Sequence, residues 1–398
     1  MPMPIASALL IVINIVLLVP VLTCTIEIVA GLLPRRRSAQ SASRPDLAIL
    51  VPAHQEETGI AATLADLHPQ LAEKDRLVVI ADNCTDATAD LARQAGAEVI
   101  ERQDSARRGK GYALDYGIRH LEAAPPKVVI IVDADCTLEP GSLDVLARQA
   151  MEYGRPAQGL YLMHAPHNDD LKLAVAAFAF RVKNHLRPLG LARMNLPCQL
   201  TGTGMAFPWA IIRDADLAHS SLVEDMKLGV ELALAGTPPL FVPEARINSS
   251  FPFSSTGAAT QRQRWEEGHL GMIGQALRLV PAAIKTRRLD ALALILDVLA
   301  PPLTMLLLLV VAALVLTLGL TMLLSLPPFA TGLALANALL LGASLILAWL
   351  THGRGVLPAR ALLGIIPYIG SKLGLYSALA RGKGSKGWIR TDRHGPKT

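Results

Sequence analysis

One stretch of the sequence decides the fold: Val128-Val129-Ile130-Ile131-Val132-Asp133-Ala134-Asp135-Cys136. Its first five residues are β-branched, and they lie between Pro125-Pro126 and Pro140-Gly141. This pattern is typical of a short strand that is buried on both faces. Because such strands occupy the middle of parallel sheets, we expect an α/β fold with residues 128–132 at its centre.

Two carboxylates follow this strand, Asp133 and Asp135. Open α/β sheets bind their ligands at the carboxyl ends of the strands. Two hard oxygen ligands at such a place suit a divalent cation that completes its shell with phosphate oxygens. The structural alternative is that Asp135 caps a helix that begins near Pro140.

The apolar residues are concentrated at the two ends of the chain. Of the 398 residues, 52% are hydrophobic, and the net charge is +5. Basic clusters lie next to the apolar ends, at Arg35-Arg36-Arg37 and in the tail of residues 381–398. Such clusters mark the cytoplasmic side of a membrane. Since no aromatic residues are interleaved with them, we expect no nucleic-acid partner.

The four cysteines form no C-x-x-C pair and show no metal-ligand spacing. We therefore expect four reduced, unpaired thiols. They are Cys24, Cys84, Cys136 and Cys198.

Residues 5–30 are apolar enough and long enough to cross a hydrocarbon core of ~30 Å. A signal peptide is the alternative, but a basic N-terminal region and a small-residue cleavage signal are both missing. We expect a transmembrane helix in residues 1–34, with Met1 outside and the following domain in the cytoplasm. A Ser-rich linker follows at residues 40–44.

Residues 45–280 alternate between strand and helix patterns. Buried strands are expected at 47–52, 77–81, 99–100 and 128–132, with helices such as 60–71 and 85–94 between them. This order predicts a right-handed, mostly parallel, Rossmann-like sheet with helices on both faces.

Polar residues follow each strong strand. His54-Gln55-Glu56-Glu57 follows the first, Asp82-Asn83-Cys84-Thr85-Asp86 the second, and the Asp133/Asp135 pair the fourth. A basic glycine loop, Arg107-Arg108-Gly109-Lys110-Gly111, precedes the fourth strand. Acidic strand ends beside a basic loop predict a site for a nucleotide diphosphate with a metal.

These motifs carry a resemblance to a known family. The chain resembles an inverting family 2 glycosyltransferase of the GT-A fold, in the membrane-embedded branch that includes cellulose, hyaluronan and poly-N-acetylglucosamine synthases. The matching segments are Pro52-Ala53-His54-Gln55-Glu56, Asp82 to Asp86, Gly109-Lys110-Gly111 with Ala113-Leu114, Asp133-Ala134-Asp135, Thr201-Gly202-Thr203-Gly204, Glu224-Asp225, and the QxxRW signature Gln261-Arg262-Gln263-Arg264-Trp265.

The resemblance implies a role for each matching residue. Asp133 and Asp135 would hold Mg²⁺ or Mn²⁺, and Asp225 would be the catalytic base. His54 and Gln55 stand where an Asn is common, which is a departure from the family pattern. The nucleotide-sugar donor would contact Pro52, Ala53, Glu56, Asp82, Lys110, Asp133, Gln261 and Arg264, and the acceptor Thr203, Gly204, Glu224 and Trp265.

The role of catalytic base is chemically reasonable for Asp225. A sugar hydroxyl is a poor nucleophile, so a carboxylate must take its proton during attack on the anomeric carbon. One base with one metal describes a single displacement with inversion, whereas a retaining site would need a second carboxylate. The alternative is an acid that only stabilises a helix N-terminus.

Gln261, Arg264 and Trp265 are spaced to share one helix face. Arg264 would meet the diphosphate, and Trp265 would stack on a sugar. The alternative is an interfacial helix with Trp at the headgroup level. Residues 171–191 are expected to form a second interfacial helix, with a core helix as the alternative.

Residues 281–380 predict the C-terminal membrane helices. We expect a short apolar or re-entrant helix, then full spans at 303–324 and 329–350. Residues 361–380 are either a third span or an interfacial segment. The basic tail favours an even number of C-terminal crossings, so we expect two spans plus an interfacial segment.

The expected function is the transfer of a sugar from a nucleotide donor to a growing polysaccharide in exopolysaccharide biosynthesis. The expected donor is a UDP-sugar. The setting is a multi-pass protein of the inner (plasma) membrane, in contact with membrane lipids and with possible export or assembly subunits. One alternative is transfer of a single sugar to a lipid acceptor. Another is a transporter or scaffold with a nucleotide-sensing domain, which should show paired, interrupted spans with ionisable residues.

Overall fold

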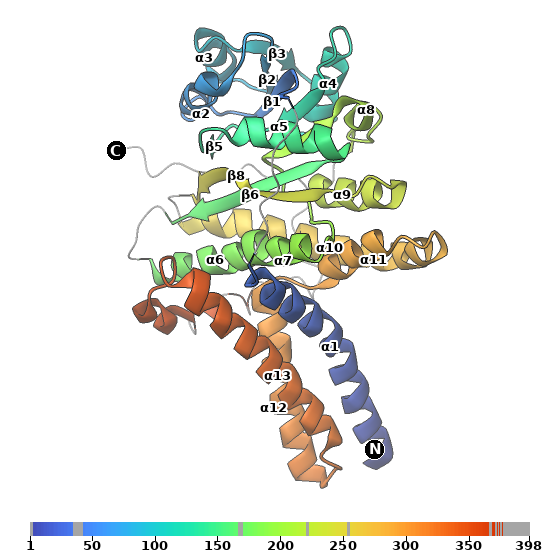
Figure 1. The fold of residues 1–398 in the computed structure, drawn as a ribbon. Coiled ribbons are helices and arrows are strands. Elements are labelled where there is room, and N and C mark those ends of the chain that lie inside the picture. The colour runs from blue at the N-terminus through green and yellow to red at the C-terminus, as the bar shows by residue number, and fades with distance from the viewer. Residues whose placement is uncertain are drawn as a thin grey trace.

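The computed structural model describes residues 3–34, 43–165, 170–219, 223–252, 255–365, 368–370, 372, 374 and 376. An α/β domain lies at one end, and long helices project from the other (Figure 1). A layer of helices separates the two parts.

The sheet has eight strands in the order β3-β2-β1-β4-β7-β6-β8-β5. Strands β3, β2, β1 and β4 run parallel, and β6 and β8 are also parallel. Strand β7 is antiparallel to both β4 and β6, and β5 is antiparallel to β8. The strands are β1 (Leu47–Ala53), β2 (Arg76–Asp82), β3 (Glu98–Arg102), β4 (Val128–Ile131), β5 (Thr137–Leu138), β6 (Ala157–His164), β7 (Met205–Pro208) and β8 (Leu240–Ser250).

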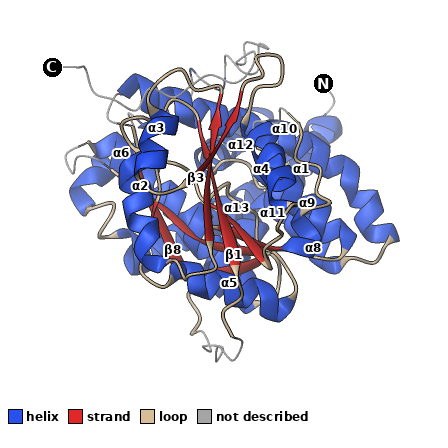
Figure 2. Cartoon of the chain, turned by 90° about the horizontal axis from the view of Figure 1, so that it is seen from above, coloured by secondary structure: helices blue, strands red, loops and turns tan. Residues whose placement is uncertain are grey.

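The predicted α/β class and the mostly parallel sheet are confirmed. Alternate residues of β1 pack on opposite faces, with Ile49 and Val51 in one apolar cluster and Ala48 and Leu50 in the other. Helices therefore cover both faces of the sheet (Figure 2). They are α2 (Ile60–Leu67), α3 (Thr88–Gln94) and α5 (Ser142–Tyr153) on the first face, and α4 (Lys110–Leu121) and α8 (Trp209–Ile212) on the second.

The helix-cap interpretation of Asp135 is wrong. Helix α5 begins at Ser142, and its N-cap is Gly141 in a left-handed conformation. No side chain makes a cap hydrogen bond there, so this helix does not account for the Asp133/Asp135 pair.

Under the sheet lies a layer of helices (Figure 1). It contains α6 (Leu171–Arg181), a π-helical turn η2 (Val182–Leu186), α7 (Arg187–Arg193), α9 (Glu224–Ala235), α10 (Ser255–Lys285) and α11 (Leu289–Leu299). Six consecutive residues of α6, 173–178, are buried. Because a helix on a membrane surface would leave one face exposed, the packing of α6 is that of a core helix rather than an interfacial one.

Three helices are long and apolar enough to cross a membrane: Ile5–Gly31, Leu303–Leu324 and Phe329–Gly353. They correspond to α1 (Met3–Gly31), α12 (Leu303–Leu324), and α13 (Phe329–Ala348) with the π-helical turn η3 (Trp349–Gly353). The short helix predicted before the first C-terminal span is α11. After the 3₁₀ turn η4 (Ala359–Gly364), most of 361–380 and all of the basic tail lie outside the described residues.

All four cysteines lie in the described part of the chain, and none forms a disulfide. This agrees with the expectation of free thiols. Three of them are buried, so they behave as small apolar side chains.

Candidate functional site

Two cavities adjoin at the carboxyl ends of β1, β2 and β4. The sheet-edge cavity has a volume of about 150 Å³, and the helix cavity, which extends toward α10 and α12, about 290 Å³. The sheet-edge cavity is lined by Pro52, Ala53, His54, Glu56, Asp82, Asn83, Ala113, Ala134 and Asp135. Both cavities share Arg108, Gly109, Lys110, Asp133 and Arg264.

Asp133 and Asp135 lie close enough to hold one metal ion. Ligand atoms of these two residues and of Cys136 are all within 4.8 Å of one another. Burial raises the pKa of the Cys136 thiol to about 12, and sulfur is a soft ligand that suits Mg²⁺ and Mn²⁺ poorly. The two carboxylates remain, and their hard oxygens fit a divalent cation such as Mg²⁺ or Mn²⁺.

Hydroxyl groups anchor both aspartates, Asp133 through its backbone N–H and Asp135 through its carboxylate. The Asp133 backbone N–H donates to Thr203 Oγ1 over 3.1 Å, and Ser249 Oγ donates to Asp135 Oδ2 over 3.1 Å. The two hydroxyl groups come from the loop before β7 and from β8, which are both distant from residues 133–135 in the sequence. They orient the pair toward the sheet-edge cavity.

Lys110 begins α4 and connects the two cavities. Its Nζ donates to Asp133 Oδ1 and, over 2.7 Å, to the Gly202 carbonyl oxygen. Burial opposes the charge, but the carboxylates of Asp133 and Glu224 outweigh it and raise the pKa of Lys110. The ammonium group therefore stays charged at the point where a phosphate would enter.

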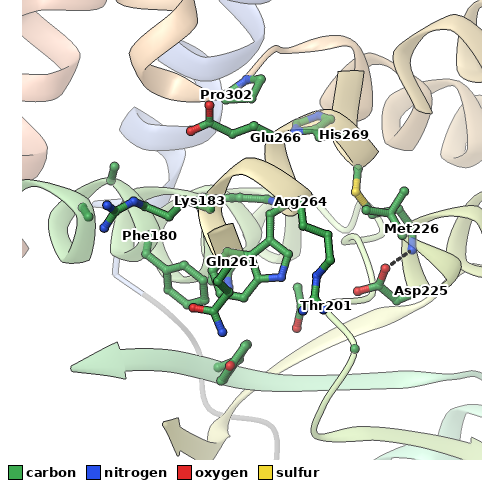
Figure 3. A pocket seen from close by; sticks show the side chains of 18 of the residues that line it. Phe180, Lys183, Thr201, Asp225, Met226, Gln261, Arg264, Glu266, His269 and Pro302 are labelled. Carbon is green, nitrogen blue, oxygen red and sulfur yellow. Dashed lines mark hydrogen bonds between the residues drawn. The ribbon is translucent and has the colours of Figure 1, made fainter. Parts of the chain in front are cut away.

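Asp225 is the second residue of α9 and faces the helix cavity. Its Oδ1 accepts a hydrogen bond of 2.8 Å from the Met226 N–H (Figure 3). Burial, followed by the neighbouring Glu224 charge, raises its pKa to about 7. A carboxyl with this pKa can accept a proton near neutral pH.

Gly202 allows Lys110 and Asp225 to approach each other. Its φ is +87°, a conformation that favours glycine. A Cβ atom at this position would lie 3.3 Å from Asp225 Oδ2 and 3.5 Å from Lys110 Nζ. The Lys110–Asp133 pair and the candidate base therefore meet around one glycine.

Asp82, the last residue of β2, is buried and hydrogen-bonded. Arg102 Nη1 donates to Asp82 Oδ1 over 2.6 Å, and Asn83 Nδ2 donates to the same oxygen over 3.0 Å. Sequence reasoning missed Arg102. Its signal was the parallel pairing of β3 with β2, which places Arg102 opposite Asp82.

Gln261, Arg264 and Trp265 all line the helix cavity from α10, and Figure 3 shows the first two. The predicted sharing of one helix face is thus confirmed. Trp265 also packs on Phe180 of α6, with ring centroids 5.8 Å apart. Gln261 is 2% exposed, and its Oε1 has no hydrogen-bond partner among the described residues.

Thr203 and Gly204 line neither cavity. Thr203 is fully buried behind Asp133, and Gly204 packs on Ile247, where a Cβ would come within 2.4 Å of a side-chain carbon. These two residues therefore lie behind the Asp133/Asp135 pair, and they do not face the cavity in which an acceptor would bind. Of the four residues predicted to contact the acceptor, Glu224 and Trp265 line the helix cavity.

Several cavity residues were not anticipated from the sequence. Lys183 and Asn184 belong to the π-helical turn η2, Arg187 begins α7, and His269 lies one turn beyond Trp265 on α10. Sequence periodicity provides no signal for a π-helical turn, although such turns are frequent at functional sites.

Comparisons with known proteins agree with this geometry. The family model described as "Glycosyltransferase like family 2" matches residues 45–268. The chain is 26% identical over 252 residues to a probable glycosyltransferase, YdaM, of Bacillus subtilis, covering 56% of this chain and 55% of the relative. It is 35% identical over 104 residues to the low-salt glycan biosynthesis hexosyltransferase Agl6 of Haloferax volcanii, covering 26% and 24%. The chain thus spans about half, or less, of the length of these relatives.

Among solved structures, the chain is similar to the mannosyltransferase PcManGT of Pyrobaculum calidifontis, which was solved with GDP-Man and Mn²⁺. The TM-score is 0.53 at 16% identity, covering 94% of this chain and 99% of that one. At this identity the likeness shows the fold alone.

Proposed function

The chain belongs to glycosyltransferase family 2, and we propose that it moves a sugar from a nucleotide diphosphate donor to an acceptor hydroxyl, with inversion, at the cytoplasmic face of a membrane. The observation that carries the proposal is the meeting of Lys110, Asp133 and Asp225 around Gly202. An anion site, a cation site and a base are thereby combined within two adjoining cavities.

The donor is assigned to the sheet-edge cavity. Asp82 and Glu56 would contact the nucleoside beside the backbone of Pro52 and Ala53, with UDP as the expected nucleotide. Arg264 lines both cavities and would meet the diphosphate with its forked donors, beside Gln261. Lys110 supplies a second cation for the same group.

Asp133 and Asp135 would hold the Mg²⁺ or Mn²⁺ ion. Such an ion, when bound, neutralises charge that grows on the leaving diphosphate. Thr203 anchors the Asp133 backbone, and Ser249 holds the Asp135 carboxylate. Mn²⁺ accompanies the donor in the similar mannosyltransferase structure, which is consistent with this assignment.

Asp225 is proposed as the catalytic base. The acceptor hydroxyl oxygen forms a bond to the anomeric carbon while its proton passes to an Asp225 carboxylate oxygen. The bond from the anomeric carbon to the diphosphate oxygen breaks, and its electron pair leaves with the nucleoside diphosphate. A single displacement of this kind inverts the anomeric configuration.

Three helices that can span a bilayer by length and composition support the membrane setting. The basic residues Arg35-Arg36-Arg37 after α1 favour a cytoplasmic catalytic domain in the inner (plasma) membrane. Within the described residues, the membrane-length helices hold few ionisable side chains, which argues against a transporter.

The acceptor was predicted to be a growing polysaccharide, with a membrane lipid as the alternative. Full-length protein in vesicles, supplied with labelled UDP-sugars and GDP-mannose in Mn²⁺, tests the proposal. Release of nucleoside diphosphate together with glycosidic product supports a transferase. Sizing the product then separates a polymer ladder from a single glycolipid. If every donor remains intact, the proposal is wrong and a nucleotide-sensing scaffold is favoured.

A further inference from the structure

The helix cavity extends from the catalytic residues to the membrane-length helix α12. Lys110, Asp133 and Asp225 line one part of it. Residues 301–304, which include the first two residues of α12, line another. Pro302 and Asp225 accordingly lie on different sides of the same cavity (Figure 3). One continuous space thus joins the site of glycosyl transfer to the start of a helix that can enter a bilayer.

Apolar side chains from several elements form part of the cavity lining, alongside charged side chains such as Arg262 and Glu266. Ala179 and Phe180 of α6, Val182 of η2, Trp265 of α10 and Leu303 of α12 all line the cavity. A hydrocarbon chain can pack against these apolar side chains without leaving polar groups of its own unpaired.

Polar groups without partners also line this cavity. Within the described part of the chain, Lys183 makes no hydrogen bond or ion pair, and Gln261 Oε1 and Thr201 Oγ1 have no hydrogen-bond partner. Gln261 is more than nine-tenths buried. Since buried polar groups are normally satisfied, these atoms point to a polar ligand group at this depth.

We propose that the acceptor is a membrane amphiphile with a free hydroxyl in its headgroup. The inference rests on the proposed glycosyl transfer and names its acceptor class. The headgroup lies among Asp225, Lys183 and Gln261, where Lys183 donates hydrogen bonds to its oxygens. The hydrocarbon chain passes Ala179 and Leu303 toward the bilayer. The lipid oxygen forms the new bond to the anomeric carbon, and its proton goes to Asp225 as the nucleoside diphosphate departs.

The direct test uses full-length protein reconstituted in vesicles of total bacterial polar lipid, with labelled nucleotide sugars and Mn²⁺. Organic extraction followed by mass spectrometry locates the label. A lipid carrying one added hexose supports the proposal. Nucleotide release with label only in a water-soluble polymer, or only in free sugar, overturns it while leaving the glycosyltransferase assignment intact. Absence of nucleotide release would instead contradict the proposed function itself.

Ala179→Leu narrows the cavity along the proposed hydrocarbon path. We expect it to raise the KM for the lipid at least about tenfold, because the larger side chain would take up space in which the hydrocarbon chain makes its apolar contacts. The KM for the nucleotide sugar should stay within about twofold. Ala312→Leu is the matched control, since Ala312 is exposed on α12 and does not line the cavity.

Lys183→Met tests the headgroup contact in the same assay. We expect a rise in the KM for the lipid with little change in the KM for the donor. Lys183→Arg, which keeps the donors, should restore part of the affinity. Equal effects of Ala179→Leu and Ala312→Leu, or a Lys183→Met effect confined to the donor KM, would overturn the assignment of this cavity to a lipid.

Discussion

Arg187 donates a hydrogen bond from Nε to Glu27 Oε2 over 2.6 Å and thereby joins helix α7 to the membrane-length helix α1. Its Nη2 also pairs with Asp297 of α11, and all three side chains are buried. Helices α1 and α7 also pack closely at this point. A Cβ at Gly190 would lie only 1.9 Å from the Glu27 carbonyl oxygen. This contact therefore ties α1 to the helix layer beneath the sheet.

Arg187→Met should lower the free energy of unfolding by about 3–5 kcal/mol, because two buried carboxylates lose their cation. Denaturant titration of the detergent-solubilised protein measures the change. Arg119→Met is the control. Arg119 pairs with Asp115 and Glu122 on an exposed helix face, where a pair contributes about 0–1 kcal/mol. Equal losses in the two variants would show that the buried cluster does not hold the domains together.

Asp225→Asn should lower kcat by about 10²- to 10⁴-fold, because the amide cannot take the proton of the acceptor hydroxyl. Binding of the nucleotide should persist, since Asp225 lines the helix cavity and not the sheet-edge cavity. Turnover and calorimetric UDP binding measure the two effects. Asp216→Asn serves as a control on an exposed carboxylate. Undiminished turnover in Asp225→Asn would place the base elsewhere.

The activity should rise with pH through about 7. Burial and the Glu224 charge raise the pKa of Asp225 to about 7, and only the deprotonated form acts as a base. Below that pH the base is protonated and kcat falls, whereas above it kcat levels off. Glu224→Gln removes one cause of the raised pKa and should move the acidic limb of the kcat profile to lower pH. A limb that stays in place would exclude this coupling.

Asp135→Ala should abolish both Mn²⁺ binding and transfer, because one of two candidate carboxylate ligands is lost. Electron paramagnetic resonance counts the bound Mn²⁺, and a product assay measures transfer. EDTA should inactivate the native chain, with recovery on addition of Mn²⁺ or Mg²⁺. Full activity of the native chain in EDTA would assign the pair to a structural role.

Thr203→Val should weaken Mn²⁺ binding about 10- to 100-fold, the usual effect of losing a partner that orients a metal ligand. The valine cannot accept the Asp133 N–H, which Thr203 Oγ1 accepts over 3.1 Å. Thr203→Ser keeps the hydroxyl and should bind Mn²⁺ nearly as the native chain does. If Ser and Val variants bind the ion equally well, the hydroxyl does not position Asp133.

The parts of the fold that depend on neighbouring residues were predictable from the sequence. The β-branched run of β4, the acids after it and the helix that begins at Glu224 follow from local pattern and turn chemistry. The three membrane-length helices follow from length and hydropathy. Because parallel strands present their carboxyl ends at one edge, Asp82 and Asp133 could also be expected to line one site.

Only the tertiary structure decided which distant residues meet these groups. Arg102 reaches Asp82 through strand pairing, Thr203 supports the Asp133 backbone from the loop before β7, and the π-helical turn brings Lys183 into the helix cavity. It also decided that α6 is enclosed between the sheet and the membrane-length helices. The physical reason is that local sequence sets backbone conformation and apolar faces, whereas contacts between residues far apart along the chain arise only from how those faces pack.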